Sequence, residues 1–171
     1  MSIVDLIADR VGAGMLFPLI PRTLGTSPKR SMLIGEELWR FLQEPEEDPE
    51  WEDRKGFLQA DLELFAEGAP IGPKYLFLLS PAREAVWEIR SVRPNPSIRV
   101  LGRFIAKDIF VATNYALRKD LDGWETREWR DAKLRSRTIW TNLFHPYQPL
   151  VTTRVEDLAS GVIDGKYFKG D

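Results

Sequence analysis

The sequence predicts an α+β fold in which a helical hairpin packs on a small antiparallel β-sheet and a C-terminal helix follows. Three observations lead to this prediction. Apolar residues recur at helical spacing over residues 33–66, where proline and glycine end each run. Apolar and polar residues then alternate over 76–117, as is typical of strands with one buried face. Helical spacing returns over 125–144.

The first part of the chain is expected to be mostly helical. We predict a short helix at 2–11, a brief strand at 15–20 and a loop at 21–31. Two helices follow at 33–44 and 49–66, joined by a short acidic turn. Leu33, Leu38 and Phe41 have the spacing of the first hairpin helix. The second helix is expected to bury Trp51, Phe57 or Leu58, Leu62 and Phe65, and Gly68 ends it.

An antiparallel meander is predicted next, with strands at 74–80, 85–92, 97–106 and 109–117. Because side chains alternate across a strand, Trp87 and Ile89 face one way and Arg90 the other. The same alternation places Arg99 and Arg103 opposite Ile98, Val100 and Phe104. One face of the sheet is therefore apolar, and the other carries arginines.

The last helix and the ends of the chain complete the prediction. The helix over 125–144 is expected to bury Trp129, Ala132, Ser136, Trp140 and Leu143. Residues 1–30 form an N-terminal extension, 31–145 form the α+β domain, and 146–171 form a tail with one short helix at 155–160.

Composition excludes several chemistries. The 171 residues contain no cysteine and one histidine, His145, which excludes disulfides, thiol nucleophiles and the usual zinc sites. The longest apolar stretch near the start, 14–20, is far shorter than the roughly 20 residues that cross a membrane. Asp5 and Asp9 stand where a secretory signal has basic residues, so we expect a cytoplasmic protein without a membrane anchor.

Charge is distributed unevenly along the chain. Residues 1–70 hold 7 basic and 14 acidic side chains, whereas residues 71–154 hold 15 basic and 8 acidic ones. Seven of the acidic side chains lie within Glu44–Asp53. This segment is either a solvated connection between helices or an internal mimic of nucleic acid that covers the basic half.

The arginines of the predicted sheet have two interpretations. Guanidinium groups bind phosphate with paired hydrogen bonds and stay charged, so Arg90, Arg99 and Arg103, with Arg118 and Lys119 at the end of the next strand, suit a phosphodiester backbone. A neighbouring Trp or Tyr could stack a base. The alternative is that the arginines lie on an exposed face of the sheet that packs against nothing, where their charge only keeps the protein soluble.

The order of motifs resembles the RelE/HigB group of toxins from type II toxin–antitoxin systems. The similar features are the helical hairpin, Val86-Trp-Glu-Ile-Arg90, Ile98-Arg-Val-Leu101, the apolar strand from Phe110 and Leu117-Arg-Lys119. They cover residues 33–144. Where the group usually has Gly-Phe before two lysines, this chain has 114–119 as Asn-Tyr-Ala-Leu-Arg-Lys.

The resemblance implies an endoribonuclease that cuts mRNA at the ribosome without a metal or cofactor. A ribose 2′-OH attacks the neighbouring phosphate, and basic side chains stabilise the negative charge that develops. The implied catalytic residues are Arg90, Arg118 and Tyr115, and the implied RNA-binding residues are Arg99, Arg103, Lys107 and Lys119. Glu88 is either a base or, as we favour, an ion-pair partner of Arg99.

Further residues and functions also have alternatives. His145 or Tyr147 could assist proton transfer, although a helix cap is the preferred role for His145. The implied partners are mRNA, the ribosome and an antitoxin, which we expect to be a small helix-turn-helix protein. The alternative functions are a ParE-like gyrase inhibitor and a non-catalytic binding module from a phage or mobile element.

Overall fold

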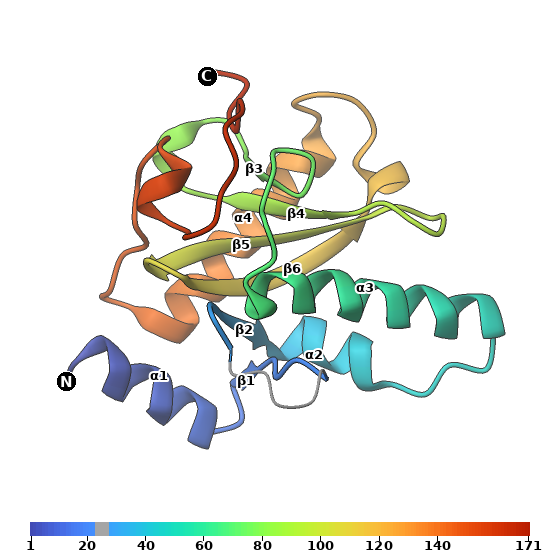
Figure 1. The fold of residues 1–171 in the computed structure, drawn as a ribbon, viewed down its shortest axis with the longest axis horizontal. Helices are drawn as coiled ribbons and strands as arrows, with labels where there is room; N and C mark the ends of the chain where they lie inside the picture. Colours follow the sequence, from blue (N-terminus) through green and yellow to red (C-terminus); the bar gives the residue numbers. More distant parts are fainter. Residues whose placement is uncertain (23–27) are drawn as a thin grey trace.

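The computed structural model describes residues 1–22 and 28–171, and it has a mixed six-stranded sheet between two helical layers (Figure 1). The sheet order is β1-β2-β6-β5-β4-β3. The main elements are α1 (Ile3–Gly12), β1 (Leu16–Pro18), β2 (Ser31–Gly35), α2 (Glu36–Gln43), α3 (Pro49–Glu67), β3 (Leu76–Leu78), β4 (Trp87–Ser91), β5 (Ile98–Ala106), β6 (Ile109–Leu117) and α4 (Arg127–Phe144). Short 3₁₀ turns are η1 (Ala82–Glu84), η2 (Arg118–Leu121) and η3 (Val155–Asp157).

The α+β class and the meander are confirmed, but the prediction of a small antiparallel sheet is wrong. β3, β4, β5 and β6 pair antiparallel in chain order, whereas β2 pairs parallel with β6. Sequence reasoning assigned Leu33 to a helix, but it lies in β2, and α2 begins at Glu36. Met32, Leu33 and Ile34 are all buried because β2 runs between two strands and is covered on both faces.

The helical hairpin forms as predicted, with local signals at its ends. The Asp48 side chain accepts a hydrogen bond from the Glu50 amide at the start of α3, and Pro49 follows at the first position. α3 ends at Gly68, whose φ of 81° is left-handed and favours glycine. α3 buries Leu58, Leu62 and Phe65 on the sheet, whereas Phe57 is 55% exposed.

The two faces of the sheet bury separate sets of side chains. Trp87, Ile89 and Val100 pack under α2 and α3, while Val86 and Leu101 pack under the N-terminal half of α4. At the other end of α4, a further group of buried apolar side chains joins this helix to α1 and the sheet: Leu6, Leu16, Leu33, Ile105, Val111, Trp140, Leu143 and Phe144. The predicted alternation of β4 and β5 is therefore confirmed.

A bulge in β6 changes which side chains face each layer. Leu101 pairs with Asn114 and Gly102 pairs with Ala112, so Thr113 is an extra residue in β6. Gly102 is required opposite the bulge because a Cβ there would lie 2.2 Å from the Val111 carbonyl oxygen and 2.5 Å from the Phe110 ring. After Thr113, each side chain of β6 therefore faces the side of the sheet opposite to the one it would face in a regular strand.

Both ends of the chain join the core. The expected helix and strand near the N-terminus form as α1 and β1, and β1 pairs with β2 at the edge of the sheet. In the tail, Leu158 and Tyr167 are buried with the side chains beneath α3, and the short helix expected there is the single turn η3. The loop expected at 21–31 lies partly outside the described residues, because 23–27 are not described.

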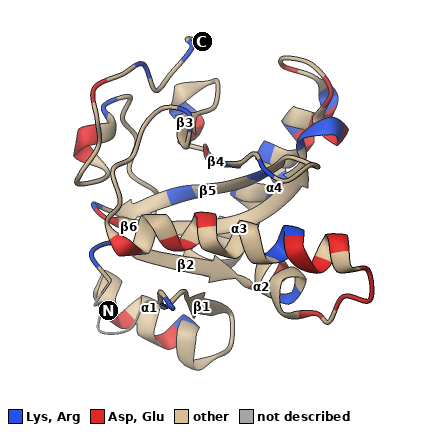
Figure 2. Ribbon diagram, turned by 45° about the vertical axis from the view of Figure 1, so that its right-hand side comes forward, with Lys and Arg blue, Asp and Glu red and all other residues tan. Residues whose placement is uncertain are grey.

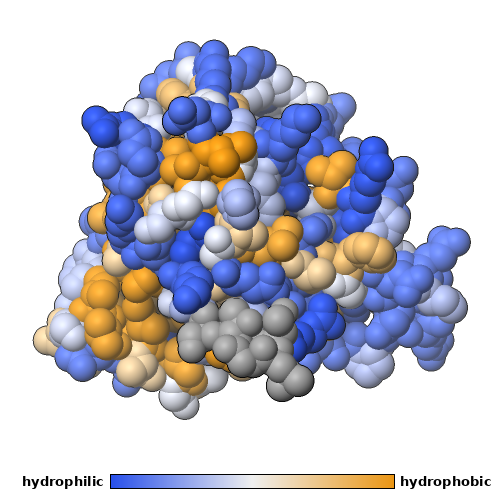
Figure 3. Space-filling view, in the orientation of Figure 1, coloured by the Kyte–Doolittle hydropathy of each residue, from blue (hydrophilic) through white to orange (hydrophobic). Residues whose placement is uncertain are grey.

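Acidic residues and apolar side chains gather in different parts of the molecule. Acidic residues gather on α3 and in the connection before it (Figure 2). Apolar side chains gather at the lower left of Figure 3, where α1 lies, and Val4 of this helix is 69% exposed. Among the described residues no helix is long and apolar enough to cross a membrane.

Candidate phosphate-binding site

A pocket of about 380 Å³ lies over the β3–β4–β5 part of the sheet, on the face that α4 covers. Cationic side chains from five parts of the chain line it: Arg90, Arg99, Arg118, Lys133 and Lys169. Two carboxylates, Glu88 and Glu125, also line it. Apolar and aromatic side chains and one glycine complete the wall: Phe77, Leu79, Gly123, Trp124 and Trp129. The pocket-lining groups therefore carry a net formal charge of +3, counting five cations against two anions.

Strand pairing explains why two of these arginines meet. Arg90 of β4 lies directly opposite Arg99 of β5. Cross-strand partners on one face have Cβ atoms about 5 Å apart, so two guanidinium groups project together from the sheet. Like charges directly opposite are unfavourable by themselves. The arrangement requires an anion nearby, either from the protein or from a ligand.

Glu88 supplies part of that negative charge. Its Oε1 accepts a hydrogen bond of 2.7 Å from Arg90 Nε, and its Oε2 lies 3.5 Å from Arg99 Nε. The Glu88 side chain is 4% exposed, whereas that of Arg90 is 28% exposed. The preferred sequence interpretation, an ion pair of Glu88 with Arg99, is confirmed, and Arg90 is a second and closer partner. One carboxylate thus balances two guanidinium groups, and donors remain for a ligand.

The remaining cations make the pocket electropositive. Burial lowers the pKa of Arg99, Glu88 opposes this shift, and the charges of Arg90 and Arg118 lower the pKa further. Arg118 follows β6, and its guanidinium lies 5.9 Å from the Trp129 ring centroid. It also donates to the Asp122 carbonyl oxygen at 2.5 Å. A bound anion would relieve the mutual repulsion of these cations.

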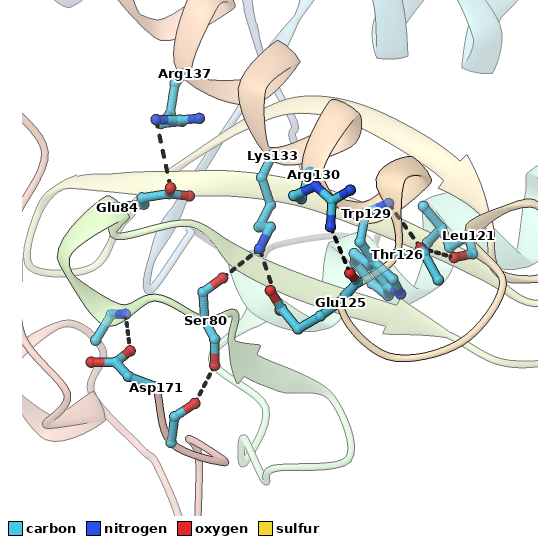
Figure 4. Close-up of polar contacts among 12 residues, drawn as sticks. Ser80, Glu84, Leu121, Glu125, Thr126, Trp129, Arg130, Lys133, Arg137 and Asp171 are labelled. Atoms are coloured by element: carbon cyan, nitrogen blue, oxygen red, sulfur yellow. Dashed lines mark hydrogen bonds and ion pairs between the residues drawn. The ribbon is translucent and has the colours of Figure 1, made fainter.

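Lys133 of α4 also lines the pocket, and its side chain points toward Ser80 and Glu125 (Figure 4). Its Nζ donates to the Ser80 carbonyl oxygen at 2.5 Å and lies 3.4 Å from Glu125 Oε1. Sequence reasoning did not select Lys133, Lys169 or Trp124. Lys133 gave a signal, because it follows Trp129 by four residues and so falls on the buried stripe of α4. No sequence signal marked Lys169, because this residue lies near the C-terminus, far along the chain from the other residues of the pocket.

Arg103 faces the same layer but does not join the pocket. Its guanidinium donates twice to the Glu84 carbonyl oxygen and lies 5.5 Å from the Trp140 ring centroid. Burial lowers the pKa of Arg103 to about 10, and the neighbouring Arg137 charge contributes to the same shift. α4 covers this part of the sheet, so Arg103 has a packing role that the strand pattern did not reveal.

Tyr115 lies on the opposite face of the sheet from the arginines. Its ring stacks on Phe41 of α2, with centroids 4.3 Å apart, and burial raises its pKa, as do Glu37 and Glu44. Its partner in β5 is Val100, whose side chain also faces the hairpin. The hydroxyl therefore cannot act on a phosphate held by Arg90 and Arg99.

Other predicted residues lie outside the pocket lining. Lys107 is in the hairpin turn between β5 and β6, at the far end of β5 from Arg99, and Lys119 is exposed in η2. His145 is the C-terminal cap of α4, as preferred, and the Tyr147 hydroxyl donates to the Met1 carbonyl oxygen. The acidic segment Glu44–Asp53 occupies the α2–α3 connection and the start of α3, and none of its residues lines the pocket.

Within residues 1–22 and 28–171, no group of three or more His, Asp or Glu side chains is arranged to hold a metal ion. The chain was compared with protein-family models, curated proteins and solved structures, and none of these comparisons gives a match.

Proposed function

We propose that this protein binds single-stranded RNA and cleaves it in the pocket over β3, β4 and β5. The observation that carries the proposal is the convergence of Arg90, Arg99 and Arg118 on one pocket, where Arg90 and Arg99 share the carboxylate of Glu88. The resemblance of the sequence motifs to those of RelE/HigB toxins supports the same function.

The chemistry follows from the groups present. The 2′-OH attacks the adjacent phosphorus, the bond from phosphorus to the 5′-oxygen breaks, and the products are a 2′,3′-cyclic phosphate and a 5′-hydroxyl. Glu88 Oε2 is buried, lies 3.5 Å from Arg99 Nε and makes no hydrogen bond within the described structure. The 2′-OH proton goes to this oxygen once the substrate phosphate has drawn the Arg99 guanidinium away from it. Lys133 donates a proton to the leaving 5′-oxygen. The three arginines stabilise the charge on the phosphorane.

An antitoxin is the expected partner of such an enzyme. We propose that it inhibits by placing an acidic segment in the same pocket, because the lining carries a net positive charge. The ribosome and mRNA remain the proposed site of action and the proposed substrate.

The test is cleavage of a labelled single-stranded RNA by the purified full chain, with EDTA present and with or without ribosomes. We expect discrete products that end in a 2′,3′-cyclic phosphate. Glu88→Gln should bind RNA at least as tightly as the wild type, because it removes a negative charge, and should cleave about 100-fold more slowly. Glu156→Gln is the matched control, since Glu156 is exposed and pairs with Arg154 in the tail.

The outcomes separate the alternatives. RNA binding without cleavage under any of these conditions would contradict the enzyme and favour a binding module. Growth arrest with DNA damage and continued translation on expression in bacteria would favour gyrase inhibition instead.

A further inference from the structure

Trp124 is an aromatic side chain that packing alone does not explain. It lies between η2 and α4, lines the pocket, and is 51% exposed. Two residues close to it hold unusual backbone, since Asp122 and Glu125 have φ of 58° and 54°. Left-handed backbone at a residue other than glycine is unfavourable and occurs where the surrounding structure imposes it. The connection thus holds a large apolar ring at the mouth of a charged pocket.

The C-terminal segment brings a cation onto this ring. Lys169 Nζ lies 4.1 Å from the Trp124 ring centroid. Its neighbours are fixed to β3 and η1, because the Leu78 amide donates to the Tyr167 carbonyl oxygen at 2.8 Å and the Ala82 amide donates to Asp171 Oδ1 at 2.8 Å. Ser80 Oγ also donates to the Gly170 carbonyl oxygen. The position of Lys169 is therefore set by a segment bound to the sheet.

We propose that Trp124 stacks the base next to the phosphate held by the three arginines, and that Lys169 leaves the ring to pair with this phosphate. This inference rests on the proposed function, because it assigns a base and a phosphate to two parts of one RNA site. Trp124 and Arg118 line the same pocket, so a base and its own phosphate can engage both.

The exchange is favourable on general grounds. An exposed contact between an ammonium and an aromatic ring is weaker than a base stacked on the same ring. The released ammonium pairs with the full negative charge of the phosphate. Lys169 thus shields the apolar ring in the free protein and adds to phosphate binding in the complex.

The experiment compares two probes of equal length: an RNA oligonucleotide and the same sugar–phosphate chain without bases. Binding is measured with the full-length protein. Trp124→Ala should bind the RNA about ten-fold more weakly, and its affinity for the chain without bases should stay at the wild-type value. Trp124→Phe should restore most of the affinity because it keeps a stacking face. Trp51→Ala is the control, since Trp51 lies in α3 and contacts Phe41 on the other side of the sheet.

Lys169→Ala tests the second part of the proposal, which is that Lys169 pairs with the phosphate. We expect weaker binding of both probes, because both contain the phosphate that Lys169 contacts, and a shallower dependence of binding on salt concentration. Lys166→Ala is the matched control from the same segment, because Lys166 is exposed and lies outside the pocket lining. Tighter RNA binding by Lys169→Ala would overturn the phosphate role.

Failure of the inference differs from failure of the proposed function. If Arg99→Ala weakens both probes and Trp124→Ala weakens neither, or weakens both equally, the stacking role is wrong and the phosphate site stands. If neither probe binds, or Arg99→Ala changes nothing, the proposed function and this inference are both overturned.

Discussion

Two groups of arginines in this protein use the same side chain in opposite ways. Arg30 and Arg54 are 3% and 1% exposed, and their hydrogen bonds go mainly to backbone carbonyl oxygens, while Arg54 Nη1 is buried without a hydrogen-bond partner within the described structure. Arg30 donates to the carbonyl oxygens of Leu64, Phe65, Ala69 and Ser160. Arg54 donates to the carbonyl oxygens of Ser91 and Pro96 and to Ser91 Oγ. These arginines tie loops and strands together.

The pocket arginines have donors left over. Arg90 and Arg99 share the Glu88 carboxylate, and each donates to one further oxygen, the Pro73 carbonyl and Ser97 Oγ respectively. Arg118 donates to the Asp122 carbonyl oxygen. A guanidinium has five N–H donors, so each keeps donors for a ligand. The acceptors around an arginine, more than its place in a strand pattern, therefore separate a structural role from a binding role.

The largest expected effect is on the free energy of unfolding, when the buried Arg54 is replaced. Arg54→Met should lower the free energy of unfolding by about 3 kcal/mol, because it leaves buried carbonyl oxygens without a donor and each such group costs about 1–3 kcal/mol. Urea denaturation measures this change. RNA affinity below the unfolding transition should match the wild type. An unchanged urea midpoint would show that Arg54 is not structural.

Smaller effects on RNA affinity and stability should distinguish Arg99 from Arg103, which both lie in β5. Arg99→Ala should weaken RNA binding about ten-fold, since a hydrogen bond to a charged group contributes about 1.5–3 kcal/mol, and should leave stability nearly unchanged. Arg103→Ala should do the reverse, because its donors go to the Glu84 carbonyl oxygen. Titration of labelled RNA and thermal unfolding of both variants measure the two effects. An equal decrease of RNA affinity in both would mean that the pocket extends beneath α4.

Much of the fold could be predicted because periodicity and helix-ending residues mark its elements. The alternation in β4 and β5 correctly assigned Arg90 and Arg99 to one face, since each side chain there follows a regular pleat. β2 was missed because its short apolar run leads directly into α2, and only pairing with the distant β6 reveals a strand.

The candidate site was harder to predict, for physical reasons. One extra residue, Thr113, reverses the face of Tyr115, and no local signal in the sequence marks that bulge. α4 covers Arg103 but leaves Arg99 in the pocket, which depends on where a helix packs. Lys169 lies 36 residues beyond Lys133, which is the nearest other pocket-lining cation in the sequence, so no sequence spacing connects it to the pocket.

The central claim is that Arg90, Arg99 and Arg118 hold an RNA backbone, and salt dependence tests it most directly. Binding of a single-stranded RNA oligonucleotide is titrated at several salt concentrations for the wild type and for the triple variant Arg90→Ala, Arg99→Ala and Arg118→Ala. We expect the double-logarithmic slope of the triple variant to be shallower by about 0.7, because the three arginines are proposed to hold one phosphate and each phosphate that is no longer neutralised contributes about this much. Equal slopes and equal affinities in a folded triple variant would contradict the claim.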